Sequence, residues 1–419
     1  MNRQIIWNEC QKVWKSPIFL VLILVFSAFN IFLIMSNSHI KNELKVANHL
    51  ADTYGLQITD ESLQLFEQDI QKDVEQLQKM TRTNSTSIYE FLEQTSWEVY
   101  NAYSEKDRAF FHDLELKEMY LNIAKNMETE YNKLSVEEMA EGTINMYSLS
   151  GKAAEMTKQE YQKLSVRLEE IKESGEYKQW AFAGNPYRMH SFLFRSLFRP
   201  LVFESLVLIV LATAFITNFE FENKTHLLSY STKKGRAFMK NKLIASLIVS
   251  SIISFLLLAV TLGTYFSVFD YAHLWNSSIS SLLNWEYNLP YITWWNMPFI
   301  KFLLLVILVL YSCMLLFSAI AFVISVFVKN SYFTFFIFTI FFAVGYLMTG
   351  FMPTSSIFII ITAFNLSVIV LNPHMLFSGQ SGLGTMFQYF EVITIIIWTF
   401  IVLATSVFAL KCFNKQEIQ

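Results

Sequence analysis

The stretch HLLSYSTKKGRAFMKNK, residues 226–242, lies between two long apolar runs at 200–219 and 243–268. It contains five Lys or Arg residues and no Asp or Glu. Each flanking run is long enough to cross a bilayer, which requires about 20 mostly apolar residues. Positive charge concentrated in a short loop between two spans is typical of the cytoplasmic side of a membrane. The stretch therefore predicts a fold built on membrane helices and indicates which side this loop faces.

The composition of the whole chain supports this interpretation. Of the 419 residues, 53% are hydrophobic and only 16% are charged, whereas soluble domains carry about 25% charged residues. Mean hydropathy is +0.35. We predict an all-α polytopic membrane protein with six transmembrane helices, at 17–36, 193–219, 243–269, 299–328, 331–350 and 391–411.

The distribution of charge predicts the orientation. Basic residues gather in the N-terminal segment 1–16, in the 220–242 loop, at Lys329 and in the tail 412–419, which all fall on one side of six spans. The 270–298 loop has no Lys or Arg and contains Trp294 and Trp295, as expected of an outer aromatic belt. Between residues 37 and 188 there are 27 acidic and 17 basic residues. We therefore expect both termini in the cytoplasm and 37–192 outside the cell.

The N-terminal segment is predicted to be retained. Its apolar core, Ile18 to Met35, is longer than the core of a signal peptide, and no A-x-A-like cleavage site follows. The residues before it have apolar side chains at helical spacing (Ile6, Cys10, Val13 and Trp14). This spacing favours an amphipathic helix at the inner membrane interface. The alternative is an ordinary charged flank.

The region from Asn330 to Phe390 contains no Asp, Glu, Lys or Arg. It includes the fifth span and a second apolar run at 355–371. A seventh full span there would place the C-terminal tail outside. The run is short, has Asn365 near its middle and is bounded by prolines, so we favour a re-entrant helical hairpin on the outer side, within 351–390.

Residues 37–192 are predicted to form an α-helical domain of five or six helices. Apolar residues recur there at steps of three and four (Leu63, Phe66, Ile70, Val74 and Leu77). Capping-box patterns occur at Ser135/Glu138 and Thr157/Glu160, with a weaker one at Ser104/Asp107. Glycines that we expect near helix ends are Gly55, Gly142, Gly151 and Gly175. The many carboxylates could attract a cationic substrate, or they could simply form a solvated surface.

Motifs of enzymatic chemistry are absent from the sequence. There is no phosphate-binding G-x-x-x-x-G-K-[ST] loop, no G-x-S-x-G elbow and no CxxC or HExxH spacing, and three cysteines give no disulfide framework. We therefore expect no enzyme activity and no bound cofactor or metal in this chain. Ionisable residues near the outer ends of spans are Glu204, Lys301 and Glu391. They could form an outer gate or pair with one another, or extend to the interface.

The sequence around the basic loop, NFEFENKTHLLSYSTKKGRAFMKNKLIASLIV, resembles the first cytoplasmic loop of ABC-2 type exporter permeases. The matching positions are Glu220, Glu222, Thr225, Leu227, Leu228, Ser231, Thr232, Gly235, Arg236 and Lys242. The amphipathic N-terminal helix, the six spans with both ends inside and the outer hairpin before the last span are also similar to the family. The long segment between the first two spans is similar to one branch of it only.

The resemblance implies a function and partners. In this family the loop is a coupling helix that docks on a separate ATPase subunit, which binds ATP and magnesium, and the permease pairs with a second permease copy or a homologous permease. It implies an exporter in the plasma membrane of a bacterium. The aromatic-rich spans, in a chain with 40 Phe, suit an amphipathic substrate such as an antimicrobial peptide, a drug or a lipid-like molecule, or they simply face lipid. Nothing suggests nucleic-acid binding. The alternative is a non-transporting sensor or scaffold whose outer helical domain binds a ligand.

Overall fold

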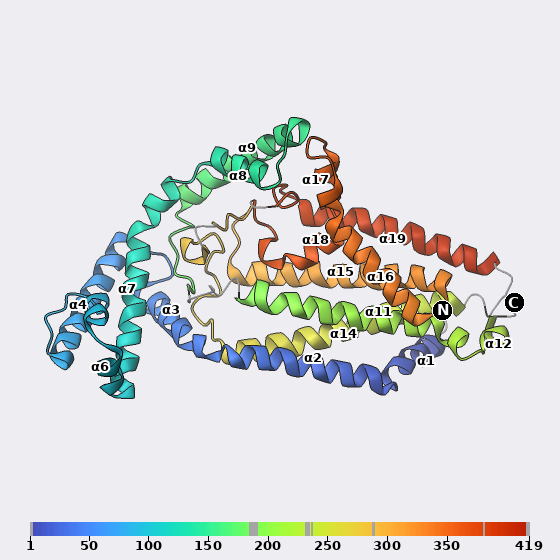
Figure 1. The fold of residues 1–419 in the computed structure, drawn as a ribbon, viewed down its shortest axis with the longest axis horizontal. Helices are drawn as coiled ribbons and strands as arrows, with labels where there is room; N and C mark the ends of the chain where they lie inside the picture. Colours follow the sequence, from blue (N-terminus) through green and yellow to red (C-terminus); the bar gives the residue numbers. More distant parts are fainter. Residues whose placement is uncertain are drawn as a thin grey trace.

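The chain is built almost entirely from α-helices (Figure 1). The computed structural model describes residues 3–183, 192–230, 235, 238–286, 290–379 and 382–415. Within these ranges no β-strand forms, and only three isolated β-bridges occur. Six helices are long and apolar enough to cross a membrane: α2 (Pro17–Ser36), α11 (Phe198–Glu222, extended at its start by the π-helical Phe192–Leu197), α14 (Phe238–Val268), α15 (Phe299–Val328), α16 (Ser331–Leu347, continued by the 3-10 turn Met348–Phe351) and α19 (Phe390–Lys415).

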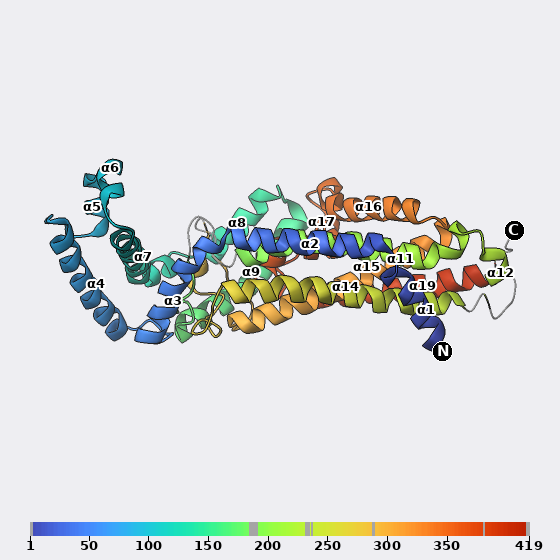
Figure 2. The same ribbon diagram turned by 90° about the horizontal axis from the view of Figure 1, so that it is seen from below.

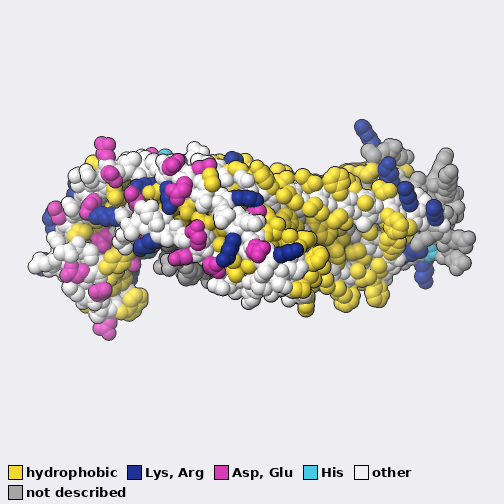
Figure 3. Space-filling view, turned by 90° about the horizontal axis from the view of Figure 1, so that it is seen from above, with side chains coloured by type: hydrophobic (Ala, Val, Ile, Leu, Met, Phe, Trp, Pro, Cys, Tyr) yellow, Lys and Arg dark blue, Asp and Glu magenta, His cyan; other side chains and the backbone are white. Residues whose placement is uncertain are grey.

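These six helices confirm the six predicted spans and indicate a multi-pass membrane protein. They run side by side as an elongated bundle, with the N- and C-termini at one end and the helices inserted between α2 and α11 at the other (Figures 1 and 2). A broad hydrophobic surface covers the middle of the bundle on the face seen in Figure 3. Lys and Arg side chains project at the terminal end, whereas mixed acidic and basic side chains cover the opposite end (Figure 3). This is the surface expected of a bundle whose middle meets lipid.

Helix α11 is the centre of the bundle. Within its most apolar stretch 72% of the residues are buried, compared with 17% in α2 and 22% in both α16 and α19. It packs against α14, α15, α16 and α2. A helix that is apolar on all sides is suited to such a central place. The outer helices leave large side chains such as Phe333 and Phe400 exposed, where lipid or another protein would contact them.

The amphipathic N-terminal helix is present as α1 (Arg3–Trp14). Its apolar face, with Ile6, Cys10 and Val13, is buried. That face packs on α14 and α11 at the terminal end of the bundle. The prediction of an amphipathic helix is confirmed, but its apolar face contacts protein, which leaves only the outward side for the membrane interface.

The segment between α2 and α11 forms a helical region that extends beyond the bundle (Figure 1). Among its described residues there are seven α-helices, one or two more than predicted: α3 (Lys41–Tyr54, after the short 3-10 turn Ser38–Ile40), α4 (Asp60–Thr81), α5 (Ile88–Gln94), α6 (Trp97–Ala102), α7 (Glu105–Asn132), α8 (Val136–Met146) and α9 (Gly151–Ser174). The predicted apolar face on α4 is only partly confirmed, because Phe66, Ile70 and Leu77 are buried while Leu63 and Val74 are half-buried.

The predicted helix ends in this region are partly correct. Ser135 caps α8, accepting a hydrogen bond from the N–H of Glu138, and Ser104 caps α7 in the same way. Thr157 is not a cap: it is buried inside α9, where its hydroxyl donates to the Ala153 carbonyl. Gly142 likewise lies within α8. Thr157 and Gly142 are residue types that often occur at helix ends. At both positions the helix continues, because packing stabilises it on either side.

The uncharged run 355–371 is not a seventh span. It forms two six-residue helices, α17 (Phe358–Ala363) and α18 (Leu366–Leu371), and Asn365 caps the second of them. Helix α18 is largely buried against α16, α11, α15 and α19. Gly345 on α16 permits this approach, since a Cβ there would lie 3.0 Å from the Asn365 amide. The run is therefore interrupted at Asn365, and the predicted re-entrant hairpin on the outer side stays a prediction.

The 270–298 segment connects the helical region with the spans. It is irregular apart from the turn Leu282–Asn284, and most of its described side chains are buried. Trp294 was expected in an outer aromatic belt, but it is 5% exposed and its indole N–H donates to the Thr385 carbonyl at 3.0 Å. A membrane-facing role for Trp294 is therefore wrong, because the loops after α18 cover it.

Candidate functional site

The basic loop contains a short helix, α12 (His226–Tyr230), at the terminal end of the bundle (Figure 1). The chain leaves α11 at Glu222, turns at Lys224, which has a positive φ of 57°, and enters α12. The N–H of Thr225 donates to the Glu220 carbonyl at 2.9 Å, which closes this turn. The start of α12 is therefore attached directly to the last turn of a central span.

A group of four charges, three of them buried and Lys12 half-buried, lies beneath α12. This ionic cluster consists of Glu9 and Lys12 on α1, Glu220 on α11 and Lys242 on α14. Lys12 lies 2.7 Å from Glu9 and 2.8 Å from Glu220, and Lys242 is hydrogen-bonded to Glu220 and lies 3.5 Å from Glu9.

The ionic cluster is electrically balanced. Its two carboxylates face two ammonium groups, and Lys242, which is fully buried, also donates to the Ile216 carbonyl. Buried charges of this kind are tolerated only when each has a partner and its remaining hydrogen bonds are made. The cluster thus joins α1, α11 and α14 in one arrangement.

Tyr230, the last residue of α12, connects the helix to the ionic cluster. It is completely buried, and its hydroxyl donates to Glu220 at 2.9 Å. Its ring packs against Phe221 on α11 and Phe413 on α19. The same apolar group includes Phe322 and residues nearby on α14 and α15. A displacement of α12 would therefore act on the ends of four membrane-length helices.

The opposite side of α12 is apolar and open. Leu227 is 54% exposed and Leu228 is 85% exposed. These two adjacent large apolar side chains lie on a five-residue helix at the terminal end of the bundle (Figure 1), where Lys and Arg side chains gather (Figure 3). Exposed apolar groups in such a place are typical of a contact surface for another protein.

The structure separates the predicted coupling residues into two groups. Leu227, Leu228 and Thr225 are exposed, and Gly235 is half-exposed. Glu222 is also exposed, but it accepts a hydrogen bond from the N–H of Ser331 at the start of α16. Ser231, Thr232 and Arg236 lie outside the described residues.

Two of the predicted coupling residues are not at the surface. Glu220 is 6% exposed and Lys242 is 0% exposed, so neither can contact a docked partner. Lys242 also does not open its span, because α14 begins at Phe238. Both predictions are corrected: these residues hold the helices beneath α12 and do not belong to its exposed side.

The three candidate gate residues are not brought together. Glu204 accepts a hydrogen bond from Asn30 on α2 at 2.7 Å. Glu391 accepts one from the N–H of Phe377 at 2.6 Å. Lys301 is exposed and donates to the Asn296 carbonyl at 3.3 Å. No hydrogen bond or ion pair joins any two of these three, all of which lie in the described part of the chain, so the alternative in which they pair with one another is not found.

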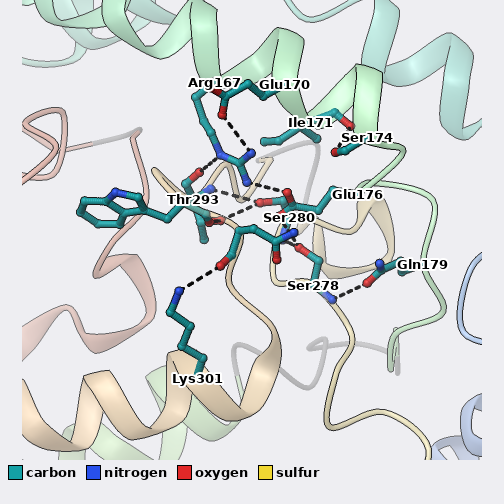
Figure 4. Close-up of polar contacts among 12 residues, drawn as sticks. Arg167, Glu170, Ile171, Ser174, Glu176, Gln179, Ser278, Ser280, Thr293 and Lys301 are labelled. Atoms are coloured by element: carbon teal, nitrogen blue, oxygen red, sulfur yellow. Dashed lines mark hydrogen bonds and ion pairs between the residues drawn. The ribbon is translucent and has the colours of Figure 1, made fainter.

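A second buried ion pair fastens the helical region to the 270–298 segment (Figure 4). Arg167 on α9 lies 2.6 Å from Glu176 and donates to the Thr293 carbonyl at 3.0 Å. The other oxygen of Glu176 accepts from the Ser278 hydroxyl at 2.7 Å. Both charged side chains are buried. Lys301 reaches the same loop from α15 (Figure 4).

Several of these residues were not singled out by the sequence. Glu9 carries a usable signal, because it is the only acid in a basic amphipathic helix and lies one residue from the apolar face at Cys10. Asn30 carries a similar signal as a polar residue inside an apolar span. Arg167 and Glu176 have no such signal, since they occur among many charged residues of the helical region.

Other chemical groups give no further site of this kind. In the described ranges no group of three or more His, Cys, Asp or Glu side chains is placed to hold a metal ion. Comparisons with protein-family models, with curated proteins and with solved structures found no match. The function must therefore be argued from the α12 surface and the cluster that supports it.

Proposed function

We propose that this chain is the membrane-spanning subunit of an exporter driven by a separate ATPase, and that α12 is the docking helix. The observation that carries the proposal is the two-sided character of α12. Leu227 and Leu228 face outward, while Tyr230 is locked inward on the ionic cluster. A merely charged connecting loop requires neither the exposed leucines nor the buried support.

The arrangement suits the transmission of force. A partner that moves α12 would act through Tyr230 and Glu220 on α1, α11 and α14, and through Phe413 on α19. Packed interiors move as units and do not deform continuously. ATP-driven closure of the partner would in this proposal rock the spans and open a path to the opposite side, where the helical region lies.

The proposal also includes the orientation, the partner subunit and the cargo that we predict from the sequence. The helical region and α17–α18 would be outside the cell, both termini inside, and the permease would act with a second permease subunit. The cargo would be amphipathic. The resemblance of residues 218–249 to ABC-2 permease loops supports these points. A sensor or scaffold remains the alternative, and it differs in having no ATPase partner.

Affinity purification of the chain in mild detergent tests the proposal. We expect an ATPase to co-purify with the unaltered protein and to be lost in Leu228→Glu, because a charge would be placed in an apolar contact. Leu65→Glu is the matched control: it makes the same change on α4, at a residue that is 50% exposed at the opposite end of the molecule.

The outcomes discriminate between the alternatives. Loss of the ATPase in Leu228→Glu but not in Leu65→Glu would support docking at α12. An unaltered protein that purifies without any ATPase in several detergents would overturn the proposal and favour the sensor or scaffold. Equal ATPase recovery in both variants would show that α12 is not the docking surface.

A further inference from the structure

A cavity lies where the helical region meets the ends of the spans. Its volume is about 380 Å³, within the about 300–1,000 Å³ of small-molecule sites. The cavity is lined by the end of α16 and the turn after it, by α17 and α18, and by the chain between Asn372 and Phe390. Tyr147, at the end of α8, closes it from the helical region.

The lining is apolar with a few neutral polar groups. Ala363, Val368, Ile369 and Leu376 form its walls, and Asn372 provides an amide. No Asp, Glu, Lys or Arg is among the residues that line it. An unpaired charge buried there would be costly. The part of a ligand that enters must therefore be uncharged.

The cavity is continuous with the hydrophobic surface of the bundle. Tyr346 and Leu347 line it, yet they are 44% and 53% exposed on the outer side of α16. The adjoining Phe351 and Phe358 are also exposed. A molecule dissolved in the bilayer could therefore reach the cavity from the membrane without crossing water.

The helical region is fixed over the cavity. The N–H of Ser150, between α8 and α9, donates to the Thr354 carbonyl at 3.1 Å. This contact holds Tyr147 near the end of α16. The lining there carries the hydroxyl groups of Tyr147, Tyr346 and Thr349, which give the cavity a polar edge on the side of the helical region. The cavity thus combines an apolar interior with this polar edge.

We propose that this cavity binds the alkyl chain of an amphipathic molecule that enters from the membrane, with its head group outside at the polar edge. The proposal needs only a membrane around the bundle, so it holds or fails independently of the transporter proposal. The alkyl chain could belong to a phospholipid or to a free fatty acid, and the experiment separates these two sources.

Photo-crosslinking in reconstituted vesicles tests the proposal. One set of vesicles contains phosphatidylcholine with a diazirine in its acyl chain, and a second contains a diazirine-bearing fatty acid. Crosslinked peptides are mapped by mass spectrometry. We expect saturable labelling of 363–376 that excess unlabelled lipid of the same kind reduces, and the probe that gives it identifies the source.

Variants distinguish the cavity from the general lipid-facing surface. Val368→Phe fills the cavity and should lower labelling of 363–376 by about tenfold, equivalent to about 1.4 kcal/mol. Ile361→Phe adds a ring on the exposed side of α17 and should leave it unchanged. Labelling of α19 near Phe400, which is 71% exposed, reports correct insertion in every sample.

Two results would overturn the inference. The first is labelling of 363–376 that rises only linearly with probe, as expected at α19. The second is saturable labelling that Val368→Phe does not reduce. If Val368→Phe loses the α19 signal and is therefore not inserted, Ala363→Leu replaces it, with the same expected loss and the same overturning result.

Discussion

Lys242 shows how one residue can hold several helices. It is fully buried on α14 and pairs with Glu220 on α11 and Glu9 on α1. Breaking a buried pair by removing one partner typically costs about 3–5 kcal/mol, because the other charge stays buried without compensation. Replacing Lys242 with methionine would leave two carboxylates with Lys12 alone, and α1 should then separate more readily from α14.

Native cysteines report this separation. Cys10 is buried on α1, where burial and the neighbouring Glu9 raise the pKa of its thiol, so it should react slowly with maleimides in the folded protein. In a Cys412→Ser background, Lys242→Met should increase Cys10 labelling by about tenfold or more, as expected for a local opening made easier by about 1.4 kcal/mol.

Cys313 reports unfolding of the whole bundle, and a lysine variant at the other end of the molecule is the control. Cys313 is buried in α15 and should stay unlabelled unless the whole bundle unfolds. Lys301→Met removes an exposed lysine at the other end and should leave Cys10 labelling unchanged. Equal labelling of Cys10 in the two lysine variants would show that the ionic cluster does not hold α1.

At the scale of single residues, the sequence predicted which residues around α12 are important better than it predicted what each of them does. The resemblance selected Glu220, Lys242, Leu227 and Leu228 together, but only the leucines are at the surface. Which charged residue is internal depends on contacts between α1 and α14, which are more than 200 residues apart. Local patterns carry no information on such distant partners. The capping prediction at Thr157 is wrong for another reason: α9 already begins at Gly151, and the Thr157 hydroxyl donates to the Ala153 carbonyl within the helix.

At the scale of elements, the junction between the helical region and the spans makes a second prediction. Arg167 and Glu176 form a buried pair, whereas Glu170 contacts Arg167 at 3.5 Å and is mostly exposed. Glu176→Leu should loosen the junction by about 3–5 kcal/mol. Glu170→Leu removes an exposed partner of the same arginine and should cost about 0–1 kcal/mol.

Tryptic cleavage after Lys178 measures this difference, because Lys178 lies two residues after Glu176 in the segment that follows α9. We expect faster cleavage in Glu176→Leu and a rate close to that of the unaltered protein in Glu170→Leu. Similar rates in both variants would mean that the buried pair does not fasten the junction.

Elements were predicted well where composition alone decides them. Each of the six apolar runs predicted to span the membrane forms a membrane-length helix, because about 20 apolar residues form a helix of bilayer length with every backbone hydrogen bond made internally. The junction was not predictable in the same way. Its 270–298 segment has little regular structure. The Thr293 carbonyl gains Arg167 as a partner, and the Ser278 hydroxyl gains Glu176, only when α9 and the residues after it pack on this segment.

At the scale of the whole molecule, the uneven distribution of charge predicts sidedness. Lys and Arg gather at the end that carries α1 and α12, and the helical region occupies the opposite end (Figures 1 and 3). Regions rich in Lys and Arg next to spans remain in the cytoplasm. The helical region should therefore face the outside, an orientation that the arrangement of helices alone does not determine.

Cysteine accessibility in intact cells provides the test. In a Cys412→Ser background, Gln71→Cys places a thiol on exposed α4, and Lys224→Cys places one at the exposed turn before α12. A membrane-impermeant maleimide should label Gln71→Cys in intact cells and Lys224→Cys only after permeabilisation. The reverse pattern would put α12 outside, where no ATPase could dock, and would therefore overturn both the orientation and the proposed coupling through α12. Labelling of both thiols in sealed cells would instead show that the two ends of the bundle do not lie on opposite sides of a membrane.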